Sequence, residues 1–402
     1  MANNYVFNDS LPVAPLKIAA LEGIKPLAQK VNDYIVNFRR NDTEELIRRK
    51  ADLHYRGYDV DSYLLDCSCP RFGSGEAKAV INESVRGADI FAMVDVTNYS
   101  LTYKVSGNVN HMSPDDHYQD LKRLIGATAA TAHRVNVIMP FLYEGRQHKR
   151  SKRESLDCAM ALQELVNMGV SNIITFDAHD PRVQNAIPLS GFDNFMPTYQ
   201  FVKALFRHDQ NLKIDKDHLM IISPDEGAMN RAVYLANNLG VDMGMFYKRR
   251  DYSRVVNGRN PIVAHEFLGT SVEGKTVLII DDMISSGESM LDTARELKER
   301  KAEKVIVCCT FGLFTSGLEK FDEFYEKGYL DYVITTNLNY RPAELLNRSW
   351  YIEADMSKYM AAIINSFNHD VSIGRSLSPT EKIQKLIQRY HADGYDYFQT
   401  IR

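Results

Sequence analysis

Two adjacent carboxylates, Asp281 and Asp282, stand between an apolar run and a short loop of serines and a glycine. The apolar run is typical of a strand buried in a parallel sheet, and a helical period follows the loop. In open α/β sheets, ligands lie at the carboxyl ends of strands, and a loop leading into a helix offers free N–H groups to a phosphate. The carboxylates can accept hydrogen bonds from the vicinal hydroxyls of a sugar or help to place a magnesium ion. The stretch therefore indicates a ribose phosphate site, and a solvated acidic pair in an ordinary turn is the alternative.

Three further groups of polar side chains also follow apolar runs directly. They are Asp177 with His179, Asp225, and Lys248 with Arg250. If the strands are parallel neighbours, all these groups face one crevice. Carboxylates and a histidine suit magnesium, while lysine and arginine suit a transferring phosphoryl group. Taken singly, a core histidine at 179 and a solvated charge run at 248–250 remain open, and only the repeated position at strand ends favours a site.

A phosphate-binding pattern upstream of the acidic pair is misleading. Residues 269–276 match G-x-x-x-x-G-K-[ST]. A true phosphate-binding loop of this kind has a helix after its Lys-Thr, because the helix N-terminus cradles the phosphates. Here Lys275 and Thr276 run into an apolar strand, so we expect a turn.

Strands and helices alternate along most of the chain, which predicts an α/β fold with mostly parallel sheets covered on both faces. The 402 residues suit two consecutive domains. We expect a first domain over 1–185, with a loop or insertion at 97–118, and a second over 186–375. A tail follows over 376–402, with a helical stretch at 382–391.

Composition narrows the class of protein. The net charge of −4 gives no basic excess for a nucleic acid, so no nucleic-acid partner is expected. Five cysteines without a C-x-x-C spacing favour a reduced compartment and no zinc site. The N-terminal residues show no signal-peptide pattern, and no apolar run approaches the length of a membrane span. A cytoplasmic protein without membrane contact is the expectation.

Six segments together resemble the ribose-phosphate pyrophosphokinase (PRPP synthetase) family. The resemblance runs from about Arg71 to about Ile373, in the family's order. The segments are RFGSGE with INESVRG, the GRQ of YEGRQHKR, FDAHD, SPDEGAMNRA, KRR and IIDDMISSGES. One such segment is weak, whereas six in sequence are highly specific.

The resemblance implies two phosphoribosyltransferase-like, Rossmann-type domains. It implies transfer of the β,γ-pyrophosphoryl group of ATP to the 1-hydroxyl of ribose 5-phosphate, with Mg²⁺ as cofactor. It also implies a homo-oligomer, a hexamer in the family, in which one loop reaches the adenine site of a neighbouring subunit.

Site residues carry over by position. Asp281 and Asp282 would hold the ribose hydroxyls, and the 5-phosphate would lie within Ser285, Ser286, Gly287, Glu288 and Ser289. Lys248 and Arg250 would be catalytic, stabilising the transferring group, while His179 and Asp225 would contact magnesium. ATP would be bound by Phe72, Ser74, Glu76, Arg146 and Gln147.

Several positions depart from the family pattern. The family usually has Asp at Ser285, Thr at Ser286 and Ser289, Gly at Glu288, and Asp at His148. A carboxylate at Glu288 repels a bound phosphate unless its side chain turns outward. These departures leave open a catalytically silent associated subunit. A phosphoribosyltransferase that consumes PRPP is a third hypothesis, disfavoured by the two-domain length and the KRR segment.

Overall fold

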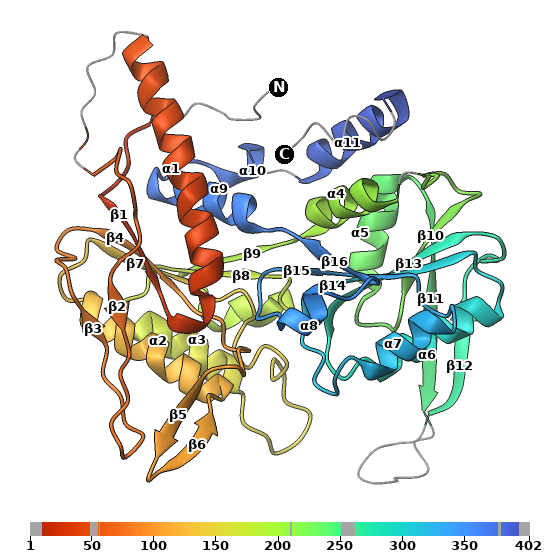
Figure 1. Ribbon diagram of the computed structural model, residues 1–402, viewed down its shortest axis with the longest axis horizontal. Helices are drawn as coiled ribbons and strands as arrows, with labels where there is room; N and C mark the ends of the chain where they lie inside the picture. The colour runs from red at the N-terminus through yellow and green to blue at the C-terminus, as the bar shows by residue number, and fades with distance from the viewer. Residues whose placement is uncertain are drawn as a thin grey trace. The chain divides into compact units, whose positions relative to one another are not determined.

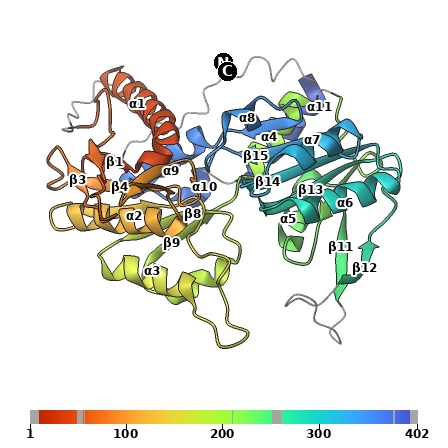
Figure 2. The same ribbon diagram turned by 60° about the horizontal axis from the view of Figure 1, so that its bottom comes forward.

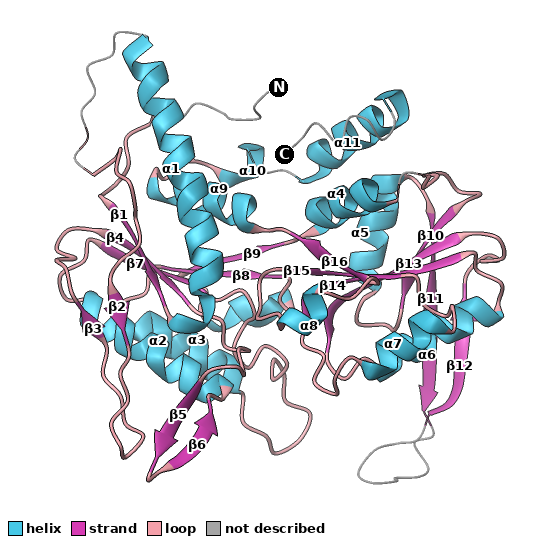
Figure 3. Ribbon diagram, in the orientation of Figure 1, coloured by secondary structure: helices cyan, strands magenta, loops and turns pink. Residues whose placement is uncertain are grey.

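A computed structural model describes residues 10–48, 55, 57–209, 211–250, 262–376 and 379–393. The chain divides into two compact units (Figure 1). One contains Met1–Met196, Asn337–Tyr340 and Asp355–Ser378, and the other contains Pro197–Thr336, Arg341–Ala354 and Pro379–Arg402. Each unit is a mostly parallel sheet covered by helices, so the predicted fold class is confirmed (Figure 3).

The first unit is built on a parallel five-stranded sheet of order β1-β4-β7-β8-β9. Its strands are β1 (Leu16–Ala20), β4 (Asp89–Met93), β7 (Arg134–Ile138), β8 (Asn172–Phe176) and β9 (Gly191–Phe195). β4 is buried along its whole length, as the apolar run requires in a sheet with two covered faces. In Figure 2, α2 (Pro114–Thr128) and α3 (Asp157–Asn167) cover one face, and α1 (Lys25–Arg48) and α9 (Ser357–Asn368) cover the other.

Shorter elements complete this unit. They are the 3-10 helices Glu22–Ile24 and Pro181–Ala186, the strand pair β2 (Cys67–Ser68) and β3 (Val80–Ile81), and α10 (Ile373–Ser376).

The segment expected as a loop or insertion at 97–118 contains regular structure. A hairpin of β5 (Thr102–Val105) and β6 (Asn108–His111) is followed at Pro114 by α2. Ser113 and Asp116 form a capping box, in which each side chain bonds the backbone N–H of the other, and this fixes the start of the helix. The helix therefore begins at Pro114, inside the segment that was expected to be a loop or insertion.

The second unit is built on a seven-stranded sheet of order β12-β11-β10-β13-β14-β15-β16. Its strands are β10 (Leu219–Ser223), β11 (Asp242–Arg250), β12 (Ile262–Leu268), β13 (Thr276–Ile284), β14 (Lys304–Gly312), β15 (Tyr332–Thr336) and β16 (Tyr351–Ala354). All pairs are parallel except β11 with β12.

Helices cover both faces of this sheet as well (Figure 1). α4 (Thr198–His208), α5 (Met229–Leu239) and α11 (Pro379–Asp393) lie on one side, and α6 (Glu288–Glu299) and α7 (Glu319–Glu326) lie on the other. The short α8 (Ala343–Leu346) precedes β16. α11 widens the helix expected at 382–391, and it buries Ile383, Leu386 and Tyr390 in the core beside α4 and α5. No helix in the described part of the chain is both long and apolar enough to span a membrane.

Two strands extend further than the apolar runs predicted. β11 continues beyond its apolar run through Lys248 to Arg250, because β12 pairs with it and satisfies its backbone groups. β13 continues past the acidic pair to Ile284, and Met283 and Ile284 pair with β14.

The misleading phosphate-binding pattern is a turn, as predicted. Gly274 has a φ of 71°, and the Lys275 N–H donates to the Val272 carbonyl at 3.0 Å. Thr276 then begins β13.

Candidate active site

The acidic pair lies where the strand order of the second sheet reverses. β10 leads through α5 to β11 on one side, whereas β13 leads through α6 to β14 on the other. β10 and β13 are parallel neighbours with Ile222 opposite Ile279. Asp225 and the pair Asp281–Asp282 therefore follow two adjacent carboxyl ends at a topological switch point, the usual ligand position in such sheets.

The loop after β10 holds Asp225 in a fixed turn. An Asp225 carboxylate oxygen accepts from the N–H groups of Gly227, at 2.9 Å, and Ala228, at 3.3 Å. The Ser223 hydroxyl donates to the Asp225 carbonyl at 2.6 Å. The carboxylate is thus positioned by backbone geometry before any ligand arrives.

Negative charge is concentrated around the acidic pair. Burial raises the pKa of Asp281 well above its usual range, and the carboxylates of Asp282 and Asp225 raise it further. Asp282 is only 3% exposed, and a guanidinium nitrogen of Arg231 on α5 lies 3.9 Å from its carboxylate. Clustered acceptors of this kind favour hydroxyl donors or a divalent cation.

The loop from Ser285 to Ser289 requires its glycine. Gly287 has a φ of 84°, and a β-carbon built there would lie 2.4 Å from the ring of Phe321. Gly287 is also the N-cap of α6, and no side chain caps the helix. The first-turn N–H groups of α6 are therefore not satisfied by a capping side chain, and the helix dipole adds to their attraction for an anion.

Glu288 turns away from this loop. Its exposed carboxylate accepts from the Lys320 ammonium of α7 at 2.7 Å. That hydrogen bond and the lysine charge lower the pKa of Glu288. The repulsion expected from a carboxylate at this position is thus offset by a cation thirty-two residues away in the sequence.

In the first unit, Phe72, Ser74 and Glu76 lie on one tight, exposed loop. The Phe72 N–H donates to the Glu76 carbonyl at 2.7 Å, and the Gly75 N–H donates to the Phe72 carbonyl at 2.9 Å. The Ser74 hydroxyl donates to the Glu76 carboxylate at 2.9 Å. Phe72 is 52% exposed, so it is not a core residue.

Two neighbouring strand ends of the same unit carry the other predicted residues. After β7, Arg146 is exposed, and the Gln147 amide donates to the Ser155 carbonyl at 2.7 Å. After β8, Asp177 adopts a left-handed backbone with a φ of 43°, two residues before His179. Such strained residues concentrate at functional turns. The His148 and His179 rings lie 5.4 Å apart, so the two loops meet.

His148 also approaches a carboxylate of this region. Its Nε2 lies 3.5 Å from Asp180, whose pKa is lowered to about 2, mainly by the hydrogen bond from Arg182. Its buried Nδ1 has no partner among the described residues.

Comparisons with known proteins agree across both units. A family model described as the N-terminal domain of ribose phosphate pyrophosphokinase matches residues 16–169, and a phosphoribosyl transferase domain model matches residues 202–342. A ribose-phosphate pyrophosphokinase of Staphylococcus epidermidis is 28% identical over 340 residues, covering 84% of this chain and 88% of that protein. The chain belongs to the ribose-phosphate pyrophosphokinase family.

Further similarities agree with this assignment. A ribose-phosphate pyrophosphokinase of Staphylococcus aureus is 28% identical over 339 residues, again covering 84% of this chain and 88% of that protein. The crystal structure of phosphoribosylpyrophosphate synthetase from Mycobacterium smegmatis has the same fold, with a TM-score of 0.66 and 21% identity, covering 88% of this chain and 99% of that one.

The predicted catalytic residues of this pyrophosphokinase lie on β11. Lys248 pairs with His265 and Arg250 with Ile262 across the β11–β12 ladder. Their side chains, like residues 251–261, lie outside what the structure describes. β11 pairs with β10, and β10 leads into the loop that carries Asp225. Lys248 and Arg250 therefore lie at the carboxyl end of the strand next to β10.

Magnesium would have few protein ligands here. Within the described ranges, no group of three or more His, Cys, Asp or Glu side chains could hold a metal ion. Mg²⁺ is commonly bound by one or two carboxylates, several waters and substrate phosphates, so a single fixed carboxylate such as Asp225 fits this mode of binding. His179 belongs to the first unit and Asp225 to the second, so their joint role stays a prediction.

Three residues near the predicted site were not assigned a role from the sequence. Arg231 lies in the same family-like segment as Asp225, and His148 directly follows Gln147 in another. Closeness in the sequence to a predicted site residue was the signal that could have identified both. Lys320 had no such signal, because its partner Glu288 precedes it by a helix and a strand.

Proposed function

We propose that this chain is an enzyme that transfers the pyrophosphoryl group of ATP to ribose 5-phosphate. The 1-hydroxyl oxygen bonds to the β-phosphorus, the bond from that phosphorus to the α,β-bridging oxygen breaks, and AMP leaves as PRPP forms. The observation that carries the proposal is the switch point between β10 and β13. There, clustered carboxylates adjoin an uncapped helix N-terminus in a member of this family.

Ribose 5-phosphate would bind across the carboxyl end of β13. Asp281 and Asp282 accept hydrogen bonds from the ribose hydroxyls, with Arg231 holding the buried Asp282 in place. The 5-phosphate lies in the loop Ser285, Ser286, Gly287, Glu288 and Ser289, on the N-terminus of α6. Hydroxyl donors at Ser286 and Ser289 keep the hydrogen-bonding capacity of the family's threonines, and at Ser285 a serine replaces a carboxylate.

ATP would meet residues of the first unit. Phe72 offers an aromatic face to the adenine, Glu76 an acceptor for its exocyclic amine, and Ser74 a hydroxyl. Arg146 and Gln147 grip the phosphates. Following the family, we propose that the loop carrying Phe72 serves the ATP site of a neighbouring subunit in a homo-oligomer.

Lys248 and Arg250 would stabilise negative charge on the transferring group. Two cations at the tip of β11 neutralise charge that develops only in the transition state, which lowers the barrier rather than strengthening substrate binding. Mg²⁺ would offset the phosphate charge when bound, and Asp225 and His179 are each proposed to contact it, as the family resemblance implies.

The silent-subunit alternative loses its main support. Glu288 had favoured that alternative because a carboxylate would repel the phosphate, yet its charge is turned toward Lys320. Supporting an active site, Asp225, Asp281 and Asp282 are gathered at one point.

Product analysis tests the proposed reaction. Purified protein is incubated with ATP, ribose 5-phosphate and Mg²⁺, and products are resolved by mass spectrometry. AMP and PRPP in equal amounts are expected, with loss of both when EDTA is present. Lys248→Ala should lower kcat about a thousandfold with little change in Tm. Absence of AMP, or formation of ADP in its place, refutes the proposal.

A further inference from the structure

The β5–β6 hairpin, which falls in the segment expected as an insertion, contacts the loop that carries Phe72, Ser74 and Glu76. On β5 the burial alternates, so Tyr103 and Val105 are half-buried while Thr102 and Lys104 are exposed. The half-buried pair faces residues 71–75. The guanidinium of Arg71 lies over the Tyr103 ring at 4.8 Å, and a β-carbon built on Gly75 would lie 3.0 Å from Cγ2 of Val105.

A backbone hydrogen bond joins the two segments between these contacts. The Ser106 N–H, at the hairpin turn, donates to the Gly73 carbonyl at 3.1 Å. α2 anchors both segments. The Tyr103 hydroxyl of the hairpin donates to Asp116 of α2 at 3.2 Å, and Arg71 of the loop pairs directly with Asp120 of the same helix at 2.8 Å.

The contacts alternate with the predicted ATP residues. The hairpin touches Arg71, Gly73 and Gly75, whereas Phe72, Ser74 and Glu76 are exposed. Residues 72–76 form a tight turn, closed by the hydrogen bonds from the Phe72 N–H to the Glu76 carbonyl and from the Gly75 N–H to the Phe72 carbonyl. The hairpin therefore contacts this turn and leaves an aromatic ring, a hydroxyl and a carboxylate of the turn exposed.

We infer that the β5–β6 hairpin is a positioning element that holds the 71–77 loop in its ATP-binding conformation before ATP arrives. The inference rests on the proposed function, because that function assigns the exposed side chains of the loop to the adenine. A loop fixed in advance does not lose its conformational freedom on binding, so the hairpin contributes to ATP affinity and to recognition of the base.

A hairpin deletion tests the inference directly. Thr102 and His111 are paired across the hairpin, so Asn-Gly can replace residues 103–110 as a two-residue turn. The KM for ATP should rise about tenfold, while the KM for ribose 5-phosphate and kcat at saturating ATP stay within about twofold. The preference for ATP over GTP should fall as well, which a simple loss of stability would not cause.

A matched pair of point variants refines the test. Val105→Ser removes the contact with Gly75 and should raise the KM for ATP, whereas Val109→Ser makes the same change at a residue of β6 that is 62% exposed, and should not. An unchanged KM for ATP and an unchanged ATP/GTP preference in both the deletion and Val105→Ser overturn the inference.

Amide hydrogen exchange gives a readout that needs no activity. The Phe72 and Gly75 N–H groups, which close the loop, should exchange faster in the deletion variant than in the wild type. The two proposals fail on different results. If the wild type makes no AMP, the proposed function is refuted. If exchange at these two amides is the same in the deletion variant and the wild type, the inference about the hairpin is refuted.

Discussion

At the scale of single residues, the position of the Glu288 charge decides whether the proposed 5-phosphate loop can accept a phosphate. Glu288 stands where the family usually has glycine, and a carboxylate there opposes a bound phosphate. Its exposed ion pair with Lys320 turns that charge outward. Lys320 therefore acts through Glu288 rather than on the substrate.

Removing Lys320 should weaken sugar-phosphate binding. Lys320→Met leaves the Glu288 carboxylate unpaired, and the KM for ribose 5-phosphate should rise about two- to fivefold at low ionic strength, as for other exposed charges. The double variant Lys320→Met with Glu288→Gln should return to the wild-type value. A KM that is the same in the single variant, or that stays raised in the double variant, would contradict this role.

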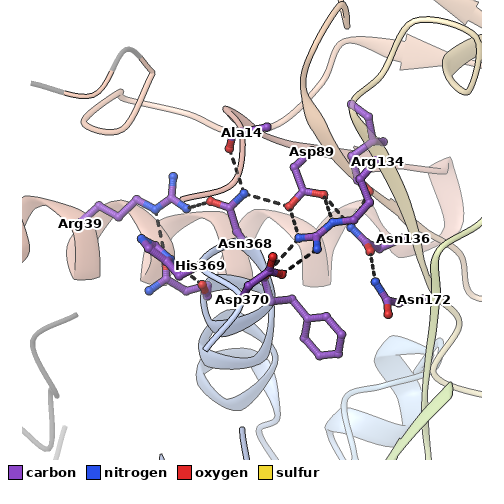
Figure 4. Close-up of polar contacts among 12 residues, drawn as sticks. Ala14, Arg39, Asp89, Arg134, Asn136, Asn172, Asn368, His369 and Asp370 are labelled. Carbon is purple, nitrogen blue, oxygen red and sulfur yellow. Dashed lines mark hydrogen bonds and ion pairs between the residues drawn. The ribbon is translucent and has the colours of Figure 1, made fainter. Parts of the chain in front are cut away.

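At the scale of elements, α9 is held in the first unit by a buried polar network (Figure 4). Arg39 of α1, only 1% exposed, donates to Asn365 at 3.1 Å and to Asn368 at 2.6 Å. Asn368 in turn donates to the Ala14 carbonyl and to Asp89 of β4. A helix that follows the second family-model match, which ends at residue 342, thereby completes the first unit.

Asn368→Ala should destabilise this unit. The change leaves Arg39, Asp89 and the Ala14 carbonyl each without one buried hydrogen-bond partner, which should cost about 3 kcal/mol of unfolding free energy. Urea unfolding measures it. Lys358→Ala, on an exposed position of the same helix, is the control and should stay within about 0.5 kcal/mol. Equal stability of the two variants would show that the network contributes little.

His369, next to this network, should make stability depend on pH. Burial lowers the pKa of His369 to about 4, so the folded protein holds the ring neutral at pH values where the unfolded chain already binds a proton. The contribution of the neutral His369 ring to the free energy of unfolding is fully present above about pH 6.5 and is lost as the pH falls toward 4. It amounts to about 3 kcal/mol at most. His369→Gln should lose less stability than the wild type between pH 7 and pH 4.5 in denaturant titrations. Parallel losses in the two proteins would contradict the assignment.

Local sequence patterns predicted the strands and the acidic site, because a buried parallel strand needs a continuous apolar run and its end is marked by the first charges. This succeeded for β10 and β13, which bring Asp225 close to Asp281. It failed where pairing partners are distant or polar. β12 escaped notice because Ile262–Leu268 includes histidine and glutamate, and the β5–β6 hairpin because Asn, Ser and Gly indicated a loop.

Contacts between distant segments could not be predicted either. The pairing of Glu288 with Lys320 and of Arg39 with Asn368 depends on which helices the fold places together. Neither pair has a sequence spacing that local patterns can detect.

At the scale of the whole molecule, we propose an ATP site that draws on two copies of the chain. Following the family resemblance, Phe72 and Glu76 would serve the site of a neighbouring subunit, whereas Lys248 would act in the site of its own subunit. Defects in these two groups should therefore complement one another. Co-expression of Lys248→Ala with the double variant Phe72→Ala and Glu76→Ala should give mixed oligomers more active than either parent alone. A mixture with no more activity than its parents would contradict a shared site.

The position of ribose 5-phosphate in a crystal of the complex tests the central claim most directly. We predict that the sugar hydroxyls lie on Asp281 and Asp282, and that the 5-phosphate lies against the N-terminus of α6 with Glu288 still turned toward Lys320. A sugar phosphate bound away from the carboxyl end of β13, or a Glu288 side chain filling the loop in its place, would contradict it.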